Sequence, residues 1–340
     1  MQESLLLPAG KLPHALLDQL LRRFPTRDPR LIVGPQMGED AAVIDFGDTY
    51  LVAKTDPITF AADAIGWYAV NVNANDIAVM GAAPRWFLAT ILLPERSATA
   101  ALAETIYSQI ADACDELGVA LAGGHTEITV GLERPIVAGF MLGEVARERL
   151  VRSSGVQPGD VLILAGSVPV EGTALIAREK ESELLAKGVD PAVVQRAHGF
   201  LHDPGISVVR AAHLAVQTVP VHAMHDPTEG GLATGIWEVA QASGVGMAVD
   251  FDAVLVPVES QAVCGAFGLD PMGTIASGAL LLAVAPADAA CLLDAFHASG
   301  LPASQIARAI GPGMTLTAKR RGQAVAFPRF RVDEIARLFG

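Results

Sequence analysis

Apolar residues recur at helical or strand spacing along most of the first half of the chain. The spacing predicts three helices, each closed by a proline or a glycine, over residues 12–24, 61–80 and 98–117. Apolar runs bounded by turn residues predict strands at 41–45, 50–54, 86–93, 119–122 and 136–144. Gly47 and Asp48 separate the first two strands, which are therefore expected to form a β-hairpin. Residues 123–127 are expected to form a loop.

The second half begins after residues 152–160, whose Ser, Gly, Pro and Asp content is typical of a connection. We therefore expect two domains, residues 1–151 and 152–340. The pattern predicts strands at 161–165 and 279–285 and helices at 172–183, 204–215, 230–242 and 287–299. Strands and helices mix without a strict βαβ repeat, and no dinucleotide-binding glycine fingerprint occurs. Each half is therefore expected to be an α+β layered domain rather than a Rossmann sheet.

Composition excludes several classes of protein. The 340 residues are 51% hydrophobic and 18% charged, which indicates a globular chain with a substantial core. A net charge of −13 disfavours nucleic-acid binding, since that affinity depends on basic patches. Apolar runs are far shorter than the roughly 20 residues of a membrane span, and no signal peptide is evident, so a cytoplasmic location is expected. The three cysteines are widely separated and predict no disulfide framework.

Two aspartates flank the predicted hairpin. Asp40 directly precedes its first strand, and Asp56 follows its second strand in the sequence Thr-Asp-Pro. Acids after a glycine often cap a turn, and this alternative stays open for Glu39 and Asp40. If the hairpin forms, however, the two carboxylates come within reach of one cation. Mg²⁺ takes one or two protein carboxylates and leaves its other positions to water and phosphate.

Polar residues interrupt the predicted helix 61–80. Asn71, Asn73, Asn75 and Asp76 are poor helix formers, and burying them costs free energy unless they have partners. Residues three or four apart share a helix face, so amide and carboxylate groups can lie side by side. A surface for a ligand or metal is favoured over a buried polar network that joins subunits or domains.

Two glycine-containing segments are further candidates. Gly123 and Gly124 permit close backbone approach, and Glu127 could supply a metal or nucleotide contact, although a structural turn also explains this segment. In the second half, Asp226, Thr228 and Gly230 precede a predicted helix, and ordinary helix capping explains much of that sequence. A glycine-rich helix N-terminus also offers free N–H groups to phosphate.

Taken together, these segments resemble the superfamily of aminoimidazole ribonucleotide (AIR) synthetase, selenophosphate synthetase, thiamine-monophosphate kinase and the hydrogenase-maturation protein HypE. The resemblance extends from about residue 37 to about 285, and it is strongest to HypE and its relatives. Its most specific parts are residues 66–78 (GWYAVNVNANDIA) and the run HDPT at 225–228 with Gly230 and Gly231.

The resemblance implies an AIR synthetase-like two-domain fold that dimerises through its N-terminal strands, with ATP in a groove at that interface. By position, Asp40, Asp56 and Asp76 match Mg²⁺- and phosphate-contacting acids, and Asn73 and Glu127 fall in nucleotide-site segments. The implied cofactors are ATP and Mg²⁺.

The activity implied is ATP-dependent phosphorylation of an amide, carboxamide or similar oxygen on a small molecule or a partner-borne group. Alternatives are a maturation factor that binds nucleotide and acts through partner proteins, and a kinase resembling thiamine-monophosphate kinase. The sequence departs from HypE in ending without a cysteine beyond Cys291, and Glu229 stands where many relatives have Arg. These departures do not favour self-modification on a C-terminal cysteine.

Overall fold

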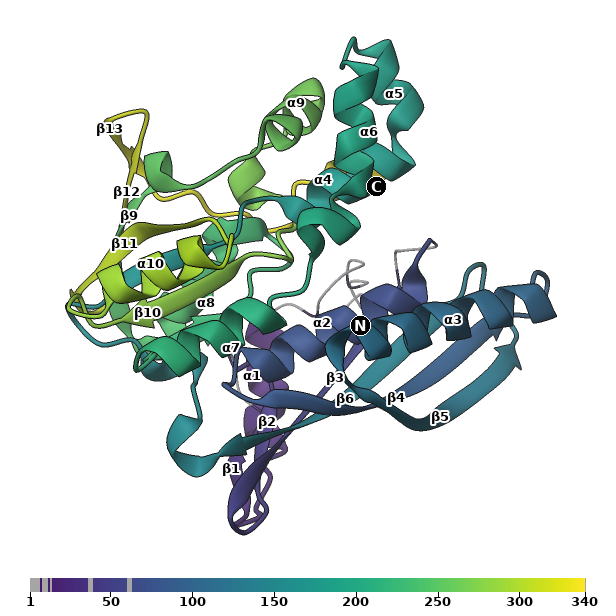
Figure 1. Cartoon of the computed structure of the whole chain (residues 1–340), viewed down its shortest axis with the longest axis horizontal. Coiled ribbons are helices and arrows are strands. Elements are labelled where there is room, and N and C mark those ends of the chain that lie inside the picture. Colours follow the sequence, from purple (N-terminus) through teal and green to yellow (C-terminus); the bar gives the residue numbers. More distant parts are fainter. Residues whose placement is uncertain (1–6, 8–11, 13, 36–38, 60–62, 340) are drawn as a thin grey trace, which may run out of the picture.

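Two β-sheets, one in each half of the chain, organise the computed structural model (Figure 1). The structure describes residues 7, 12, 14–35, 39–59 and 63–339. Both sheets are mainly antiparallel and carry helices, so the expected α+β two-domain architecture is confirmed. The exact boundary at residues 151 and 152 stays a prediction.

The first sheet has six strands in the order β1-β2-β3-β6-β4-β5. Its only parallel pair is β4 with β5, within the described residues. The elements of this half are α1 (His14–Arg23), β1 (Leu31–Val33), β2 (Ala42–Asp45), β3 (Thr49–Ile58), α2 (Ile65–Ala78), β4 (Ala83–Pro94), α3 (Ala100–Leu117), β5 (Ala120–Thr129) and β6 (Ile136–Ala146).

Helices α2 and α3 cover one face of this sheet (Figure 1). Helix α2 is buried over almost its whole length. It packs closely against β6 because Gly139 has no side chain, which would otherwise collide with the amide of Asn73. The opposite face of the sheet has no helix on it in this view, and its outward side chains include the partly exposed Trp86 and Phe140.

The second sheet has seven strands in the order β13-β12-β9-β11-β7-β10-β8. Strand β7 is fully buried, as expected of a central strand with an unbroken apolar run. The elements of this half are β7 (Val161–Ala165), α4 (Val170–Glu179), α5 (Glu181–Ala186), α6 (Pro191–Gly199), α7 (Val209–Thr218), β8 (Ala223–His225), α8 (Gly231–Ser243), β9 (Val245–Asp250), α9 (Val258–Phe267), β10 (Leu280–Val284), α10 (Ala289–Ala298), β11 (Ala303–Pro312), β12 (Leu316–Arg320), β13 (Gln323–Ala326) and α11 (Ala336–Phe339).

The two halves share one large hydrophobic core that runs from β2 and α2 to α7 and α10. Asn75 of α2 joins them by two buried hydrogen bonds. Its amide donates to the carbonyl of Ile206 at 2.8 Å, and its oxygen accepts from the N–H of Val208 at 2.8 Å. This contact fixes α2 against the segment that leads into α7.

The structure confirms the β2–β3 hairpin and most predicted helices, but three predictions were wrong. Residues 123–127 continue strand β5 instead of forming a loop. The helix predicted at 172–183 is interrupted at Lys180, and the one predicted from residue 204 begins at Val209, after a π-type turn that contains Pro204. Helices α6 and α9 were not predicted. In the described part of the chain, every helix is too short or too polar to cross a membrane.

Candidate active site

A buried lysine lies among the aspartates of the first half. Lys54 and Asp56 are two residues apart on β3, so both side chains point to the α2 face of the sheet. The Nζ of Lys54 is 3.1 Å from Oδ2 of Asp76 on α2 and 3.7 Å from Oδ2 of Asp56. The structure therefore brings Asp56 and Asp76 together around one ammonium group.

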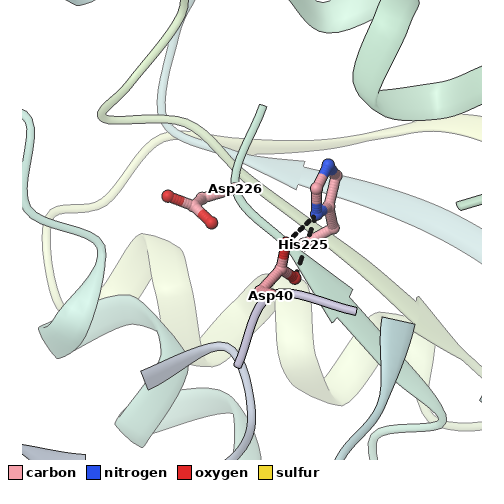
Figure 2. Close-up of side chains that lie close together, drawn as sticks. All are labelled: Asp40, His225 and Asp226. Atoms are coloured by element: carbon pink, nitrogen blue, oxygen red, sulfur yellow. Dashed lines mark hydrogen bonds and ion pairs between the residues drawn. The ribbon is translucent and has the colours of Figure 1, made fainter. Parts of the chain in front are cut away.

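Asp40 precedes β2 and faces the second half of the chain. Its carboxylate lies 3.1 Å from Nδ1 of His225, at the end of β8, and accepts a hydrogen bond of 2.8 Å from Ser153 Oγ. Ligand atoms of Asp40, His225 and Asp226 all lie within 4.8 Å of one another. In Figure 2 the Asp226 carboxylate and the His225 ring flank the carboxylate of Asp40. Side chains from both halves thus form one cluster.

His225 is held as a cation between two acids. Its Nε2 lies 3.1 Å from Oε2 of Glu238 on α8, and its Nδ1 faces Asp40. Burial alone would lower the pKa of His225, but Asp40 and Glu238 raise it well above its usual value. Burial would likewise raise the pKa of Asp40, but His225, Lys54 and Ser153 lower it. Both members of the pair are therefore charged near neutral pH.

Two further aspartates are only partly compensated. Burial raises the pKa of Asp226 well above its usual value, and the charges of Asp76 and Asp40 add to this effect. Burial also raises the pKa of Asp76 to about 7, against the opposing attraction of Lys54. The cluster holds more carboxylates than cations, so a bound divalent cation would stabilise it.

The connection between the halves holds the residues that directly precede β2. Arg152 donates two hydrogen bonds, of 2.9 and 2.7 Å, to Oε1 of Glu39, and Ser154 Oγ donates a third at 2.8 Å. Glu39 is therefore an anchor for the connection, while the neighbouring Asp40 turns into the cluster. The preceding residues Met37 and Gly38 lie outside the described residues.

The asparagines of α2 have separate roles. Asn71 donates within the helix to the carbonyl of Trp67, and Asn75 joins the two halves, so the ligand surface expected for these two is not what the structure shows. Asn73 donates to the carbonyls of Ala69 and Asp56 at 2.8 and 3.2 Å. Its buried Oδ1 has no hydrogen-bond partner within the described ranges.

Gly123, Gly124 and Glu127 lie apart from this cluster. They belong to the exposed edge strand β5, which β6 and β4 separate from β3. Gly124 allows close backbone approach, but to strand β4: an added side chain would lie 2.0 Å from the carbonyl oxygen of Ala89. Glu127 contacts His125 at 3.4 Å. Within one chain, these residues are not brought to the aspartates.

The N-terminus of α8 is already occupied by an acid of the same chain. The N–H of Gly230 donates to Oδ2 of Asp333 at 2.6 Å, and the N–H of Gly231 donates to the carbonyl of Thr228 at 3.0 Å. The expectation of free N–H groups at Gly230 was therefore wrong. Asp226 belongs to the Asp40 cluster, whereas Thr228 contributes its backbone to this helix start.

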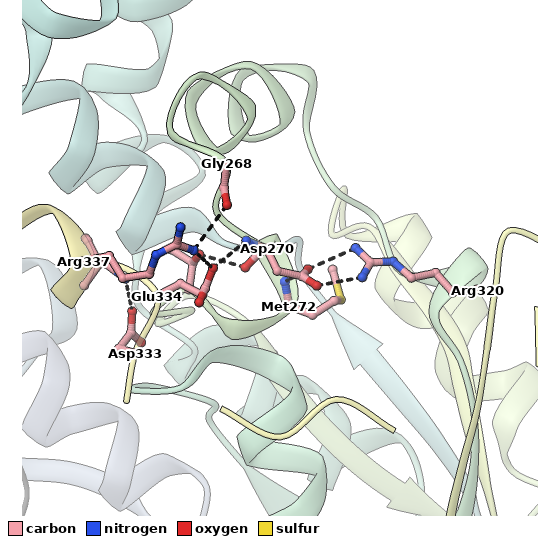
Figure 3. A network of polar contacts seen from close by, with 9 residues as sticks. Gly268, Asp270, Met272, Arg320, Asp333, Glu334 and Arg337 are labelled. Carbon is pink, nitrogen blue, oxygen red and sulfur yellow. Dashed lines mark hydrogen bonds and ion pairs between the residues drawn. The ribbon is translucent and has the colours of Figure 1, made fainter. Parts of the chain in front are cut away.

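Asp333 belongs to a C-terminal strap, residues 327–339, that returns from β13 across the second half. Figure 3 shows the polar network beside it, in which Glu334 accepts from the N–H of Asp270 at 3.0 Å and Arg320 binds the Asp270 carboxylate. The ring of Phe330 covers Gly273 so closely that no side chain would fit at that glycine. These contacts hold the Asp333 carboxylate in place.

Sequence reasoning missed Lys54 and Glu238. A usable signal existed for Lys54, since a lysine that ends an apolar strand run two residues before Asp56 must share its face. Glu238 gave no comparable signal, because a single acid on a helix is usually solvated. Its role depends on how α8 packs against β8.

Known proteins share this fold and sequence pattern. The AIR synthase related protein N-terminal domain model matches residues 38–145, and the C-terminal domain model matches residues 157–319. The chain is 30% identical over 293 residues to a hydrogenase expression/formation protein of Methanocaldococcus jannaschii, covering 84% of this chain and 83% of that protein. It is 32% identical over 281 residues to carbamoyl dehydratase HypE of Cupriavidus necator, covering 81% and 74%.

Solved structures agree on the fold. HypE in complex with ATP superposes with a TM-score of 0.71 at 23% identity, covering 96% of this chain and 97% of that one. A ThiL structure with AMPPCP and TMP gives a TM-score of 0.70 at 20% identity, covering 92% and 94%. At these identities the similarity establishes the fold alone.

Proposed function

Because the chain belongs to the AIR synthase related family, we propose that it is an ATP-dependent enzyme of the HypE type. It would phosphorylate an amide, carboxamide or similar oxygen of a small molecule or of a partner-borne group. The observation that carries this proposal is the meeting of Asp40 and Asp226 from the two halves, beside the buried Asp76 and the partly exposed Asp56. The 32% identity to carbamoyl dehydratase HypE supports the reaction type.

The cluster fits Mg²⁺. Both ring nitrogens of His225 face carboxylates, so the imidazole is not free to bind a metal, and the ligands left are the oxygens of Asp40 and Asp226. Mg²⁺ prefers such oxygen ligands, and one or two carboxylates suffice when substrate phosphates complete the shell. We assign Asp40 and Asp226 as its ligands, with Asp56 and Asp76 facing the same site from the first half.

The protein groups around this site have distinct tasks. Phosphoryl transfer depends on positioning the reacting groups and on neutralising the charge that develops on the phosphoryl oxygens. A magnesium ion, when bound, would neutralise this charge. His225 fixes the orientation of the Asp40 carboxylate, and Glu238 fixes His225 in turn. The Oδ1 of Asn73, which has no hydrogen-bond partner among the described residues, offers an acceptor on the same side of α2 as the Asp56 backbone. No side-chain nucleophile is required.

Two alternatives predict different products. A maturation factor that acts through partners, as the HypE–HypF complex illustrates for HypE, would bind nucleotide and turn it over slowly. A kinase of the ThiL kind would leave a stable phosphorylated product. Release of inorganic phosphate together with a dehydrated or cyclised product favours the leading proposal over both.

A homodimer is part of the proposal. Among the described residues, the face of the first sheet away from α2 and α3 and its edge strand β5 expose the large apolar residues Trp86, Leu121, Ile128 and Phe140. A second copy covering them would remove this surface from water and would place β5 with Glu127 beside a partner.

Thermal unfolding with ATP alone, Mg²⁺ alone and both together tests the nucleotide site. A ligand at about 100 times its dissociation constant adds roughly 2.7 kcal/mol, which raises the midpoint by several degrees. We expect the full shift only with both components, and none in Asp226→Asn. Asp48→Asn makes the same change at an exposed position of the β2–β3 turn and should keep the shift. A wild-type midpoint that no combination moves contradicts the proposal.

A further inference from the structure

Lys54 occupies a position that a metal ion could take. Its nitrogen lies 3.1 Å from an oxygen of Asp76 and 3.7 Å from an oxygen of Asp56, two of the acids that the family resemblance matches to Mg²⁺- and phosphate-contacting residues. The side chains of Lys54 and Asp76 are 22% and 9% exposed, so water screens this contact weakly. A cation at the position of the nitrogen would face both carboxylates.

The charge of Lys54 is fixed by its surroundings. Burial alone would lower the pKa of a lysine, but Asp76, Asp56 and Asp40 hold the pKa of Lys54 above its usual value. Unlike Mg²⁺, an ammonium group needs no octahedral shell and cannot dissociate from the chain. Lys54 thus partly compensates Asp56 and Asp76 without a metal, whereas Asp226 forms no ion pair with a cation in the described part of the chain.

We propose that Lys54 is a built-in counter-ion that takes the place of a second divalent cation. In the absence of nucleotide, the protein would then bind one ion, at Asp40 and Asp226, and Lys54 would keep a second ion away from Asp56 and Asp76. This inference rests on the proposed function for the first ion. A lysine that instead contacted a nucleotide phosphate would affect ATP binding and leave the number of bound metal ions unchanged.

Counting bound Mn²⁺ on the full-length protein without nucleotide, by electron paramagnetic resonance, tests the inference. The wild type should bind a single ion. Lys54→Met removes the charge at similar length and should bind a second ion, whereas Lys54→Arg keeps the charge and should not. The double variant Lys54→Met, Asp76→Asn should lose the second ion again. Equal counts in wild type and Lys54→Met overturn the inference, as does a gain that survives Asp76→Asn.

The same series separates this inference from the proposed function. Asp226→Asn should lose the first ion in the wild-type background. If it does not, the assigned metal site is wrong, while a second ion gained by Lys54→Met still supports the role of Lys54. If Lys54→Met unfolds without metal, Mn²⁺ should restore its folding and raise its melting temperature far more than that of the wild type. Failure of Mn²⁺ to do so also overturns the inference.

Discussion

His225 shows how one side chain can unite the two halves of a binding site. The imidazole cation lies between Asp40 of the first half and Glu238 of the second, with Asp226 next to it in sequence. An unpaired buried charge is expensive, whereas a pair with satisfied hydrogen bonds is tolerated. The imidazole therefore determines whether the neighbouring carboxylates can remain charged in the absence of metal.

We expect His225→Gln to destabilise the protein by about 3–5 kcal/mol near neutral pH, because it removes the cation of a buried pair. The raised pKa of His225 gives stability that is lost only as pH rises through that value, and the lowered pKa of Asp40 gives stability that is lost as pH falls through it. The wild-type pair is thus intact throughout the weakly acidic and neutral range. In the variant, burial raises the pKa of Asp40, so protonation should relieve the repulsion.

Urea denaturation at about pH 7.5 and about pH 5.5 measures this effect. The difference in the free energy of unfolding between wild type and His225→Gln should be smaller at the lower pH. His297→Gln, at an exposed position of α10, should stay within about 0.5 kcal/mol of the wild type at both pH values. If the stability difference between wild type and His225→Gln is the same at both pH values, lost packing rather than lost charge explains the destabilisation.

The sequence allowed the individual acids of the site to be predicted better than their partners. The hairpin that was expected to carry Asp40 and Asp56 is confirmed. Asp56 lies with Asp76 beside Lys54, whereas Asp40 lies with His225 and Asp226, so one cation shared by Asp40 and Asp56 stays a prediction. The approach of His225 to Asp40 could not be predicted, since it depends on packing between residues 185 positions apart. Asn75 illustrates the opposite error: its type suggested a ligand contact, yet its amide satisfies backbone groups of the other half.

At the scale of elements, the start of α8 depends on a segment that lies about 100 residues further along the chain. The strap places the Asp333 carboxylate on the N–H of Gly230, at 2.6 Å, and on that of Ile275, at 3.3 Å. A negative charge there is favourable for the helix, but burial is unfavourable for the charge. Burial is the larger effect, and it raises the pKa of Asp333 to about 6.

Asp333→Asn is expected to keep an acceptor for these N–H groups while removing the buried charge. Because the folded pKa lies above the unfolded value, ionisation of Asp333 costs stability above about pH 6, and this cost disappears as pH falls. The variant should therefore be at least as stable as the wild type near pH 7.5, with a smaller advantage near pH 5.

Asp333→Ala is the informative contrast, since it leaves the N–H groups of Gly230 and Ile275 without their acceptor and should cost about 1–3 kcal/mol at either pH. Midpoints of urea denaturation for the three proteins provide the comparison. If the wild type is more stable than Asp333→Asn near neutral pH, the charge of Asp333 itself stabilises the start of α8.

At the scale of the whole molecule, an exposed apolar sheet face stands out. Phe140 and Trp86 are 38% and 37% exposed on the side of the first sheet away from α2 and α3. Large apolar side chains that point outward from neighbouring strands form a continuous patch, and such patches mark association surfaces. The two-sheet plan itself could be predicted from strand and helix order, but this exposed face could not, because alternation alone does not say what covers each side.

Phe140→Asp is expected to convert a dimer to a monomer. The molecular mass measured by light scattering on the size-exclusion eluate should then fall from twice 35.4 kDa to that single-chain mass. Phe46→Asp makes the same substitution at the more exposed turn between β2 and β3, where it should leave the dimer intact. A wild type that elutes as a monomer at all concentrations would exclude the dimer, and a monomeric Phe46→Asp would place its interface elsewhere.

The position of Lys54 in the sequence also affects how the first half can fold during synthesis. The ribosome completes the strand with Lys54 and Asp56 and then the helix with Asp76 long before it reaches His225 and Asp226. During that interval the emerging first half already holds acids that repel one another when buried, and the cation that will face Asp40 does not yet exist. Because Lys54 belongs to the same half as Asp56 and Asp76, this part of the chain carries its own neutralising charge from the start. Domains made early can fold before the rest of the chain follows, and such a charge removes one obstacle to their doing so.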